Sequence, residues 1–194
     1  MTSRSVTHAT IAPIVISESI LEGQSVRLRP VQPGDLPKFA EWLGDPEVRR
    51  WLAALSEAPT LEQEVEWYED SRANPDNVLW SIETIEGQLL GTVELRLAPS
   101  AHRAELGIAI QDKLQWSKGF GTETIKLVLE YGFEDLDLNR IELTVDEQNA
   151  RGRRCYEKCG FREEGLMREH RFVEGEYGNT VMMAVLRKEW QVSR

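Results

Sequence analysis

Two glycines stand where a protein chain can hold a phosphate group, in the segment Trp116-Ser117-Lys118-Gly119-Phe120-Gly121-Thr122. Residues 104–110 before it are typical of a strand, and apolar residues recur at helical spacing over 125–133. Glycines let a backbone approach a ligand closely, and the free N–H groups of a helix's first turn attract anions. The segment therefore predicts a pyrophosphate site built mainly from backbone amides.

Two other kinds of phosphate-binding loop are excluded. A Walker-type loop would continue with Lys and then Ser or Thr after the glycines, and this one does not. A dinucleotide-binding fold would need a third glycine and an early βαβ unit. Within the segment, Lys118 either adds positive charge or is an ordinary surface lysine, and Thr122 can cap the helix, donate to phosphate, or do both.

A second segment whose residues could take part in chemistry runs from Asn149 to Phe161, and most of it is predicted to be helical. Cys155 and Cys159 lie four residues apart on the predicted helix, which is a poor disulfide placement and favours a reducing, cytoplasmic setting. With no activating base nearby in sequence, Cys155 is interpreted as a small packed side chain and not as a nucleophile.

These segments must be positioned by an α/β fold. The alternation of apolar residues and the turn signals predict a mixed sheet, antiparallel early and with parallel crossovers later. Helices are expected over 35–43, 45–55, a stretch starting with the capping box Thr60–Gln63, 120–133 and 150–159. Strands are expected over 25–29, 78–85, 89–97, 102–110, 140–145, 161–168 and 180–186, with Arg171–Asn179 as the last connection.

Bulk properties limit the function classes. The 194 residues suit one domain, residues 18–194, preceded by an arm over residues 1–17. A formal net charge of −10 argues against a general nucleic-acid binder and suits a cationic partner, although acidity for solubility alone explains it equally well. No apolar run reaches the ~18–20 residues of a membrane span, so no membrane partner is expected.

The two segments together resemble the acetyl-CoA motifs of the GNAT N-acetyltransferase superfamily. The later stretches Gly165–Phe172, Gly175–Tyr177 and Leu186–Trp190 are similar to the RimJ/RimL-like branch, named for ribosomal-protein N-terminal acetyltransferases. The resemblance covers residues 25–190. It implies a mostly antiparallel, twisted sheet of six to seven strands flanked by helices, with a V-shaped splay between the fourth and fifth strands.

The resemblance also implies where acetyl-CoA binds. The pantetheine arm would lie along backbone groups of Ile108, Ala109 and Ile110, and Asn149 would contact the cofactor. The pyrophosphate would be held by Trp116, Ser117, Lys118, Gly119, Phe120, Gly121 and Thr122. No metal is implied. Two departures stand out: Trp116 replaces the usual Gln or Arg, and Gly152 stands where many relatives carry Ser.

An amine attacks a thioester only when deprotonated, whereas α-amines and lysines have pKa values of roughly 8 and 10. A base and a donor to the leaving thiolate are therefore expected. Glu105 is the candidate base, because it precedes the pantetheine contact by three residues. It could instead be a strand glutamate paired with Arg103, with His102 or His170 as other bases. The resemblance implies that Tyr156, which matches the family tyrosine, is the candidate acid that could donate a proton to the thiolate, or else Tyr156 only packs its helix on the sheet.

The resemblance implies direct acetyl transfer to a primary amine, with a protein or peptide N-terminal α-amine as first choice. A small cationic amine, polyamine- or aminoglycoside-like, is the alternative, and a non-catalytic acyl-CoA sensor is a third. Whether the chain forms a homodimer stays open. The acceptor site would use the early helices, where we expect some of the aromatic or acidic residues to line the mouth: Trp42, Trp51, Trp67, Tyr68, Glu62, Glu64, Glu66, Glu69 and Asp70.

Overall fold

A computed structural model describes residues 19–192, except 53, 54, 56 and 174. The arm predicted over residues 1–17 lies outside the described residues. Within the described part of the chain, no helix has the length and apolar character that crossing a membrane requires.

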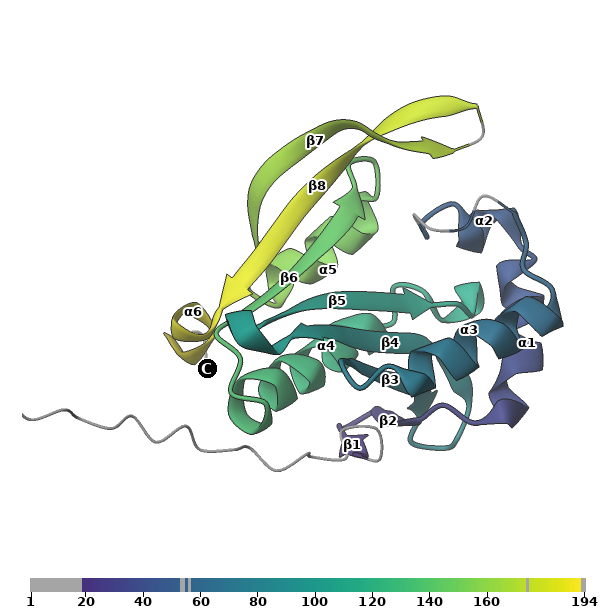
Figure 1. Ribbon diagram of the computed structural model, residues 1–194, viewed down its shortest axis with the longest axis horizontal. Helices are drawn as coiled ribbons and strands as arrows, with labels where there is room; N and C mark the ends of the chain where they lie inside the picture. The colour runs from purple at the N-terminus through teal and green to yellow at the C-terminus, as the bar shows by residue number, and fades with distance from the viewer. Residues whose placement is uncertain (1–18, 53–54, 56, 174, 193–194) are drawn as a thin grey trace, which may run out of the picture.

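One twisted sheet of eight strands forms the centre of the molecule, in the order β1-β2-β3-β4-β5-β6-β8-β7 (Figure 1). All neighbours are antiparallel except β5 and β6. The sheet has one strand more than the six to seven predicted, because Leu21 and Glu22 pair with Leu28 and Arg27. The strands are β1 Leu21–Glu22, β2 Val26–Pro30, β3 Asn77–Thr84, β4 Leu89–Ala98, β5 Arg103–Ile110, β6 Arg140–Asp146, β7 Arg162–Val173 and β8 Glu176–Leu186.

The helices begin where their capping residues predict. Asp45 accepts a hydrogen bond from the N–H of Glu47, with Pro46 next to it, and Thr60 and Gln63 form the predicted capping box. Gly119 caps the helix after the glycine loop. The α-helices are α1 Leu36–Leu43, α2 Pro46–Arg49, α3 Leu61–Ala73, α4 Phe120–Glu130, α5 Ala150–Lys158 and α6 Arg187–Val192, and a π-helical turn, Tyr131–Asp135, continues α4.

The main core lies between the sheet and α4, where Ile125, Val128 and Leu129 meet the inward side chains of the strands. A smaller cluster joins α1 and α3 at the other side of the sheet, around Phe39 and Tyr68. Helices therefore cover both faces of the sheet near β3–β5 (Figure 1).

The predicted splay is present between β5 and β6, the fourth and fifth strands of the prediction. Their parallel pairing extends only from Arg103 opposite Arg140 to Glu105 opposite Glu142. Beyond these residues the strands separate, as Figure 1 shows, while β5 stays paired with β4 and β6 with β8. Among the described residues, no strand neighbours the remaining backbone groups of β5 on that side.

Two predicted boundaries are wrong, and the side chain of Arg171 connects the two segments concerned. Residues 171–179 were expected to be a connection, but most of them extend β7 and β8 into a long hairpin that projects beyond the rest of the sheet (Figure 1). The helix expected over 45–55 ends at Arg49. The buried side chain of Arg171, on β7, binds the carboxylate of Asp146 and donates to the Arg50 carbonyl at 2.7 Å. The Arg50 carbonyl therefore accepts a hydrogen bond from the hairpin.

Candidate active site

A cavity of about 960 Å³ occupies the opening between β5 and β6 and extends to both faces of the sheet. It is the larger of the two hollows described for the molecule. Nearly every site residue predicted from sequence lines it, namely Glu105, Ile108, Ala109, Ile110, Trp116, Ser117, Gly119, Phe120, Gly121, Thr122, Asn149 and Tyr156. Lys118 does not line it, and its ammonium group donates to Gln115 at 2.8 Å.

The glycine loop has the backbone of an anion site. Ser117 and Gly119 both have positive φ, 64° and 95°, around Lys118. Backbone conformations of this type turn successive N–H groups toward a common point and form a concavity for anions. A Cβ placed on Gly119 would meet nothing within 4 Å, so the space in front of the N-terminus of α4 is open. The loop therefore fits a phosphate group.

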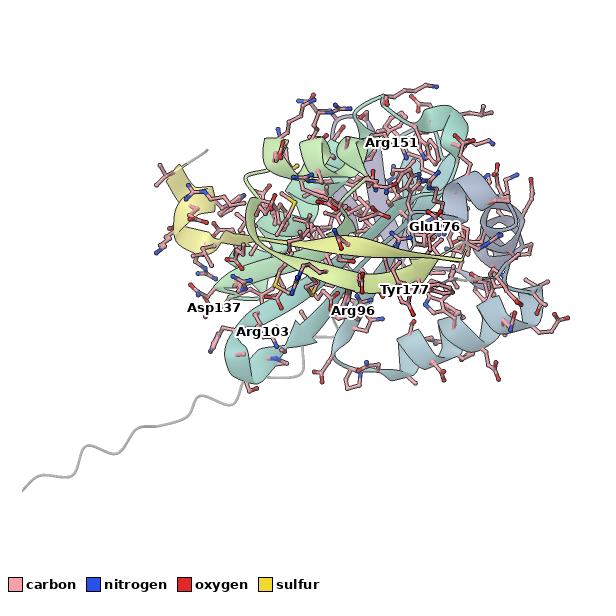
Figure 2. All side chains as sticks on the ribbon, turned by 90° about the horizontal axis from the view of Figure 1, so that it is seen from above. Arg96, Arg103, Asp137, Arg151, Glu176 and Tyr177 are labelled. Atoms are coloured by element: carbon pink, nitrogen blue, oxygen red, sulfur yellow. The ribbon has the colours of Figure 1, made fainter. Side chains whose placement is uncertain are left out.

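Trp116 acts as a structural part of this loop. Its indole N–H donates to the Ile110 carbonyl at 2.6 Å, which fixes the end of β5. The guanidinium of Arg151 lies 3.7 Å from the centroid of the Trp116 ring, within the range of a cation–π interaction. Arg151 lies across the sheet from Arg96, as Figure 2 shows. A positive charge therefore reaches the loop from α5, at a position that sequence reasoning missed.

Replacing Arg151 tests whether this charge serves the loop. We expect Arg151→Ala to raise the KM for acetyl-CoA about tenfold or more with a kcat changed by less than about twofold, because a charge-assisted hydrogen bond contributes about 1.5–3 kcal/mol. Steady-state kinetics at varied acetyl-CoA measure both constants. Arg72→Ala, which removes the same charge from an exposed position on α3, is the control. An equal change in both variants would contradict the assignment.

Along β5, alternate residues turn their backbone groups to opposite sides. The carbonyl of Ala109 faces Gly91 of β4, and the N–H of Gln111 donates to the Leu90 carbonyl at 2.8 Å. Ile108 and Ile110 consequently turn their backbone groups toward the opening. Because the Ile110 carbonyl already accepts a hydrogen bond from Trp116, the backbone of Ile108 is the best placed to form hydrogen bonds with a ligand in the opening.

Asn149 forms the N-cap of α5, and its side-chain oxygen accepts from the N–H of Gly152 at 2.9 Å. A Cβ on Gly152 would lie 2.8 Å from the Asn149 side-chain nitrogen. The glycine at position 152 thus lets Asn149 fold over the helix start. No group among the described residues accepts a hydrogen bond from the amide nitrogen of Asn149, which lies in the cavity wall as an available donor.

Tyr156 is partly buried in the cavity wall, and its ring packs edge-on against Phe161 with 6.0 Å between centroids. Burial raises the pKa of its hydroxyl well above the ordinary value, and the nearby thiols of Cys155 and Cys159 raise it further. The phenol is therefore protonated at neutral pH and can donate a proton or a hydrogen bond.

Both cysteines are free and lie against the loop. The thiol of Cys155 is 3.2 Å from the Thr122 hydroxyl, and the thiol of Cys159 donates to the Thr122 carbonyl at 3.6 Å. The neighbouring thiol of Cys159 lowers the pKa of Cys155, and the thiol of Cys155 raises that of Cys159. Their contacts tie α5 to the first turn of α4.

Glu105 extends from β5 into the cavity, where its carboxylate pairs with Arg96 at 3.0 Å. Arg103, the partner considered from sequence, instead pairs with Glu142. His102 and His170 do not line the cavity. Glu105 thus lies at the last paired position of β5 and β6, directly where the opening begins.

The face of the sheet that bears Arg96 carries most of the acidic groups of the cavity. Glu94 and Arg96 project from β4 on the side opposite the buried Val93 and Leu95, and Asp146 pairs with Arg171. Trp51 and Trp67 line this part of the cavity, whereas Trp42 borders the second hollow and Tyr68 lies in the small core.

Some of the acidic residues of helix α3 are expected from sequence to line the mouth of the acceptor site. Glu62, Glu66, Glu69 and Asp70 are exposed, but Glu64 is only 5% exposed and lines the cavity. Among the described residues, no group of three or more His, Cys, Asp and Glu side chains is arranged to hold a metal ion.

The chain matches the acetyltransferase (GNAT) domain over residues 25–162. It is 30% identical over 168 residues to the spermidine N(1)-acetyltransferase of Escherichia coli (strain K12), covering 86% of this chain and 88% of that enzyme. It is 28% identical over 154 residues to the aminoglycoside N(6')-acetyltransferase type 1 of Klebsiella pneumoniae, covering 74% and 77%.

A solved structure with the same fold is the spermidine N-acetyltransferase from Vibrio cholerae in complex with CoA and spermine. It is 26% identical, with a TM-score of 0.79, and the match covers 86% of this chain and 98% of that one. With the splayed strands and the glycine loop, these matches show that the chain belongs to the GNAT family of N-acetyltransferases, acyltransferases that use acetyl-CoA.

Proposed function

We propose that the protein transfers the acetyl group of acetyl-CoA directly to a primary amine of a small cationic molecule. The observation that carries this proposal is the position of the opening between β5 and β6. It connects the anion-binding loop on one face of the sheet with an acidic cleft on the other. A donor bound through the loop and an acceptor drawn by negative charge can meet there.

The acceptor class is inferred from charge. Glu64, Glu94, Glu105 and Asp146 line the cleft, and the whole chain carries a net charge of −10. An anionic surface of this kind raises the local concentration of cations. The named acceptors of the similar enzymes, spermidine and an aminoglycoside, are of the same chemical class.

A protein or peptide N-terminal α-amine, the first choice from the RimJ/RimL-like resemblance, is the second candidate. The observation in its favour is the long β7–β8 hairpin, which borders the cleft through Arg171 and Thr180 and offers exposed apolar residues, Phe172 and Tyr177, near its tip. An extended peptide could lie against it. The charge of the cleft favours the small cation.

When bound, acetyl-CoA supplies an activated thioester. In the proposed mechanism, the backbone amides after Ser117 hold its phosphates, and the backbone of Ile108 orients its arm along β5. Glu105 accepts the proton of the incoming ammonium, directly or through water. The hydroxyl of Tyr156 donates to the departing thiolate.

The role of Glu105 can be tested through the pH profile. With Glu105→Gln, we expect kcat/KM at neutral pH to fall roughly 100-fold, the lower end of the usual contribution of a general base. The rate should then continue to rise toward the pKa of the free amine, about 10 for a primary alkylamine. Rate measurements from pH 6 to about 10 detect this shift. An unchanged pH profile would exclude Glu105 as the base. The matched control is Glu142→Gln, which changes the glutamate opposite Glu105 on β6.

The acceptor class is tested by measuring CoA release with purified protein, acetyl-CoA and three acceptors: a polyamine, an aminoglycoside and a peptide with a free N-terminus. Turnover on the polyamine or aminoglycoside at kcat/KM at least tenfold above the peptide supports the proposal. The reverse order would support the N-terminal acceptor. Acetyl-CoA binding without turnover on any acceptor would favour the non-catalytic sensor.

A further inference from the structure

The acidic groups of the cleft differ in whether they have a partner. Glu94 and Glu105 both pair with Arg96, and Asp146 pairs with Arg171. Glu64 is only 5% exposed, yet no group among the described residues donates a hydrogen bond to its carboxylate or forms an ion pair with it. Burial alone raises its pKa.

The fold explains why Glu64 is buried. Tyr68, one helical turn later on α3, packs into the small core with Phe39, so the same helix face turns Glu64 inward. The capping box at Thr60 and Gln63 fixes the start of the helix and hence the direction of this face. Glu64 thereby reaches the cavity, beside Trp67 and Leu79.

An unpartnered buried carboxylate destabilises the protein, because the desolvated charge is not compensated. A cationic ligand entering the cleft would supply the missing partner. On the proposed function, the reacting amine must be deprotonated, so it cannot be the lasting partner of this carboxylate. A second ammonium group on the acceptor can be.

The order of the strands indicates how far Glu64 lies from the opening beside β5, where the other amine of the acceptor would react. Helix α3 packs on β3, and β4 lies between β3 and β5, whose far edge borders the opening. Two strand spacings amount to roughly 10 Å. An aliphatic diamine or polyamine in extended form bridges a distance of this order, whereas a monoamine leaves Glu64 unpaired.

We propose that Glu64 is a specificity-determining residue, which binds a non-reacting ammonium group of the acceptor and selects acceptors with two well-separated cationic groups. This inference rests on the proposed function and extends it, since it assigns the second cation of the substrate to one side chain. Glu64 takes no part in the proton transfers at the opening.

The test compares an eight-carbon α,ω-diamine with the matching eight-carbon monoamine, for wild type and Glu64→Gln. We expect the ratio of kcat/KM for diamine over monoamine to fall roughly 10- to 100-fold in the variant, the loss typical of one hydrogen bond to a charged group. Calorimetric titration of the diamine into the CoA-bound protein should show a matching loss of affinity.

Glu66→Gln, an exposed glutamate on the same helix, is the control and should leave the ratio unchanged. The thermal midpoint of Glu64→Gln should equal or exceed that of wild type, because an unpaired buried charge is removed. If the diamine-to-monoamine ratio of kcat/KM is unchanged in Glu64→Gln, or falls equally in Glu66→Gln, the role of Glu64 is overturned and the proposed function stays intact. Acetyl-CoA binding without acetylation of either amine by wild type would overturn both.

Discussion

Gly119→Glu should abolish acetyl-CoA binding while the protein still folds. The new carboxylate would enter the open space in front of α4 and compete with phosphate for the same N–H groups. Losing two charge-assisted hydrogen bonds, each about 1.5–3 kcal/mol, raises the Kd at least about 100-fold. Isothermal titration with acetyl-CoA measures this loss.

Backbone strain must be separated from charge in this experiment. Gly119 has φ of 95°, a conformation that costs a side-chain-bearing residue roughly 1–2 kcal/mol. Gly87→Glu is a matched control, because Gly87 has φ of 87° in the β3–β4 turn with nothing within 4 Å of an added Cβ. It should lose similar stability but keep its affinity for acetyl-CoA. Unchanged affinity in Gly119→Glu would refute the loop assignment.

The second large effect is expected for Tyr156→Phe, which should lower kcat roughly 100-fold with little change in the KM for acetyl-CoA. Only the hydroxyl is lost, whereas the ring and its contact with Phe161 stay. The size follows from the usual contribution of a general acid. Kinetics with saturating amine, together with the thermal midpoint, separate the loss of a proton donor from a loss of folding.

The pKa of Tyr156 adds a further expectation. Because burial raises this pKa, the hydroxyl stays protonated as pH increases through the ordinary tyrosine value near 10. The wild-type rate should therefore show no alkaline decline due to Tyr156 below that pH. Kinetics of Tyr156→Phe equal to those of wild type would remove the acid role and leave Tyr156 as a packing residue.

Local signals in the sequence predicted the elements that local chemistry determines. The Asp45-Pro46 and Thr60-Gln63 caps mark helix starts because the capping groups lie within three residues of each other. The glycine loop is equally local. The family resemblance then implied the splay, since nothing in the residues of β5 or β6 alone indicates where their pairing ends.

What could not be predicted depends on contacts between distant segments. In the β7–β8 hairpin, Arg171 contacts Asp146 and Arg50, which are distant in sequence, and the mostly exposed residues of β7 carry no apolar alternation. Glu64 resembles its solvated neighbours in sequence, and only the packing of Tyr68 reveals that it is buried. The position of Arg151 over Trp116 likewise depends on how α5 meets the loop.

The separation of β5 from β6 after Glu105 has a consequence for the life of the protein in a cell. It leaves an exposed strand edge in the middle of a sheet, and unpaired edges are where chains associate wrongly. A ligand lying along that edge would shield it, and at 100 times its Kd would add about 2.7 kcal/mol to the folding free energy. The abundance of the enzyme should then follow the supply of coenzyme A, falling through aggregation or proteolysis when the metabolite is scarce.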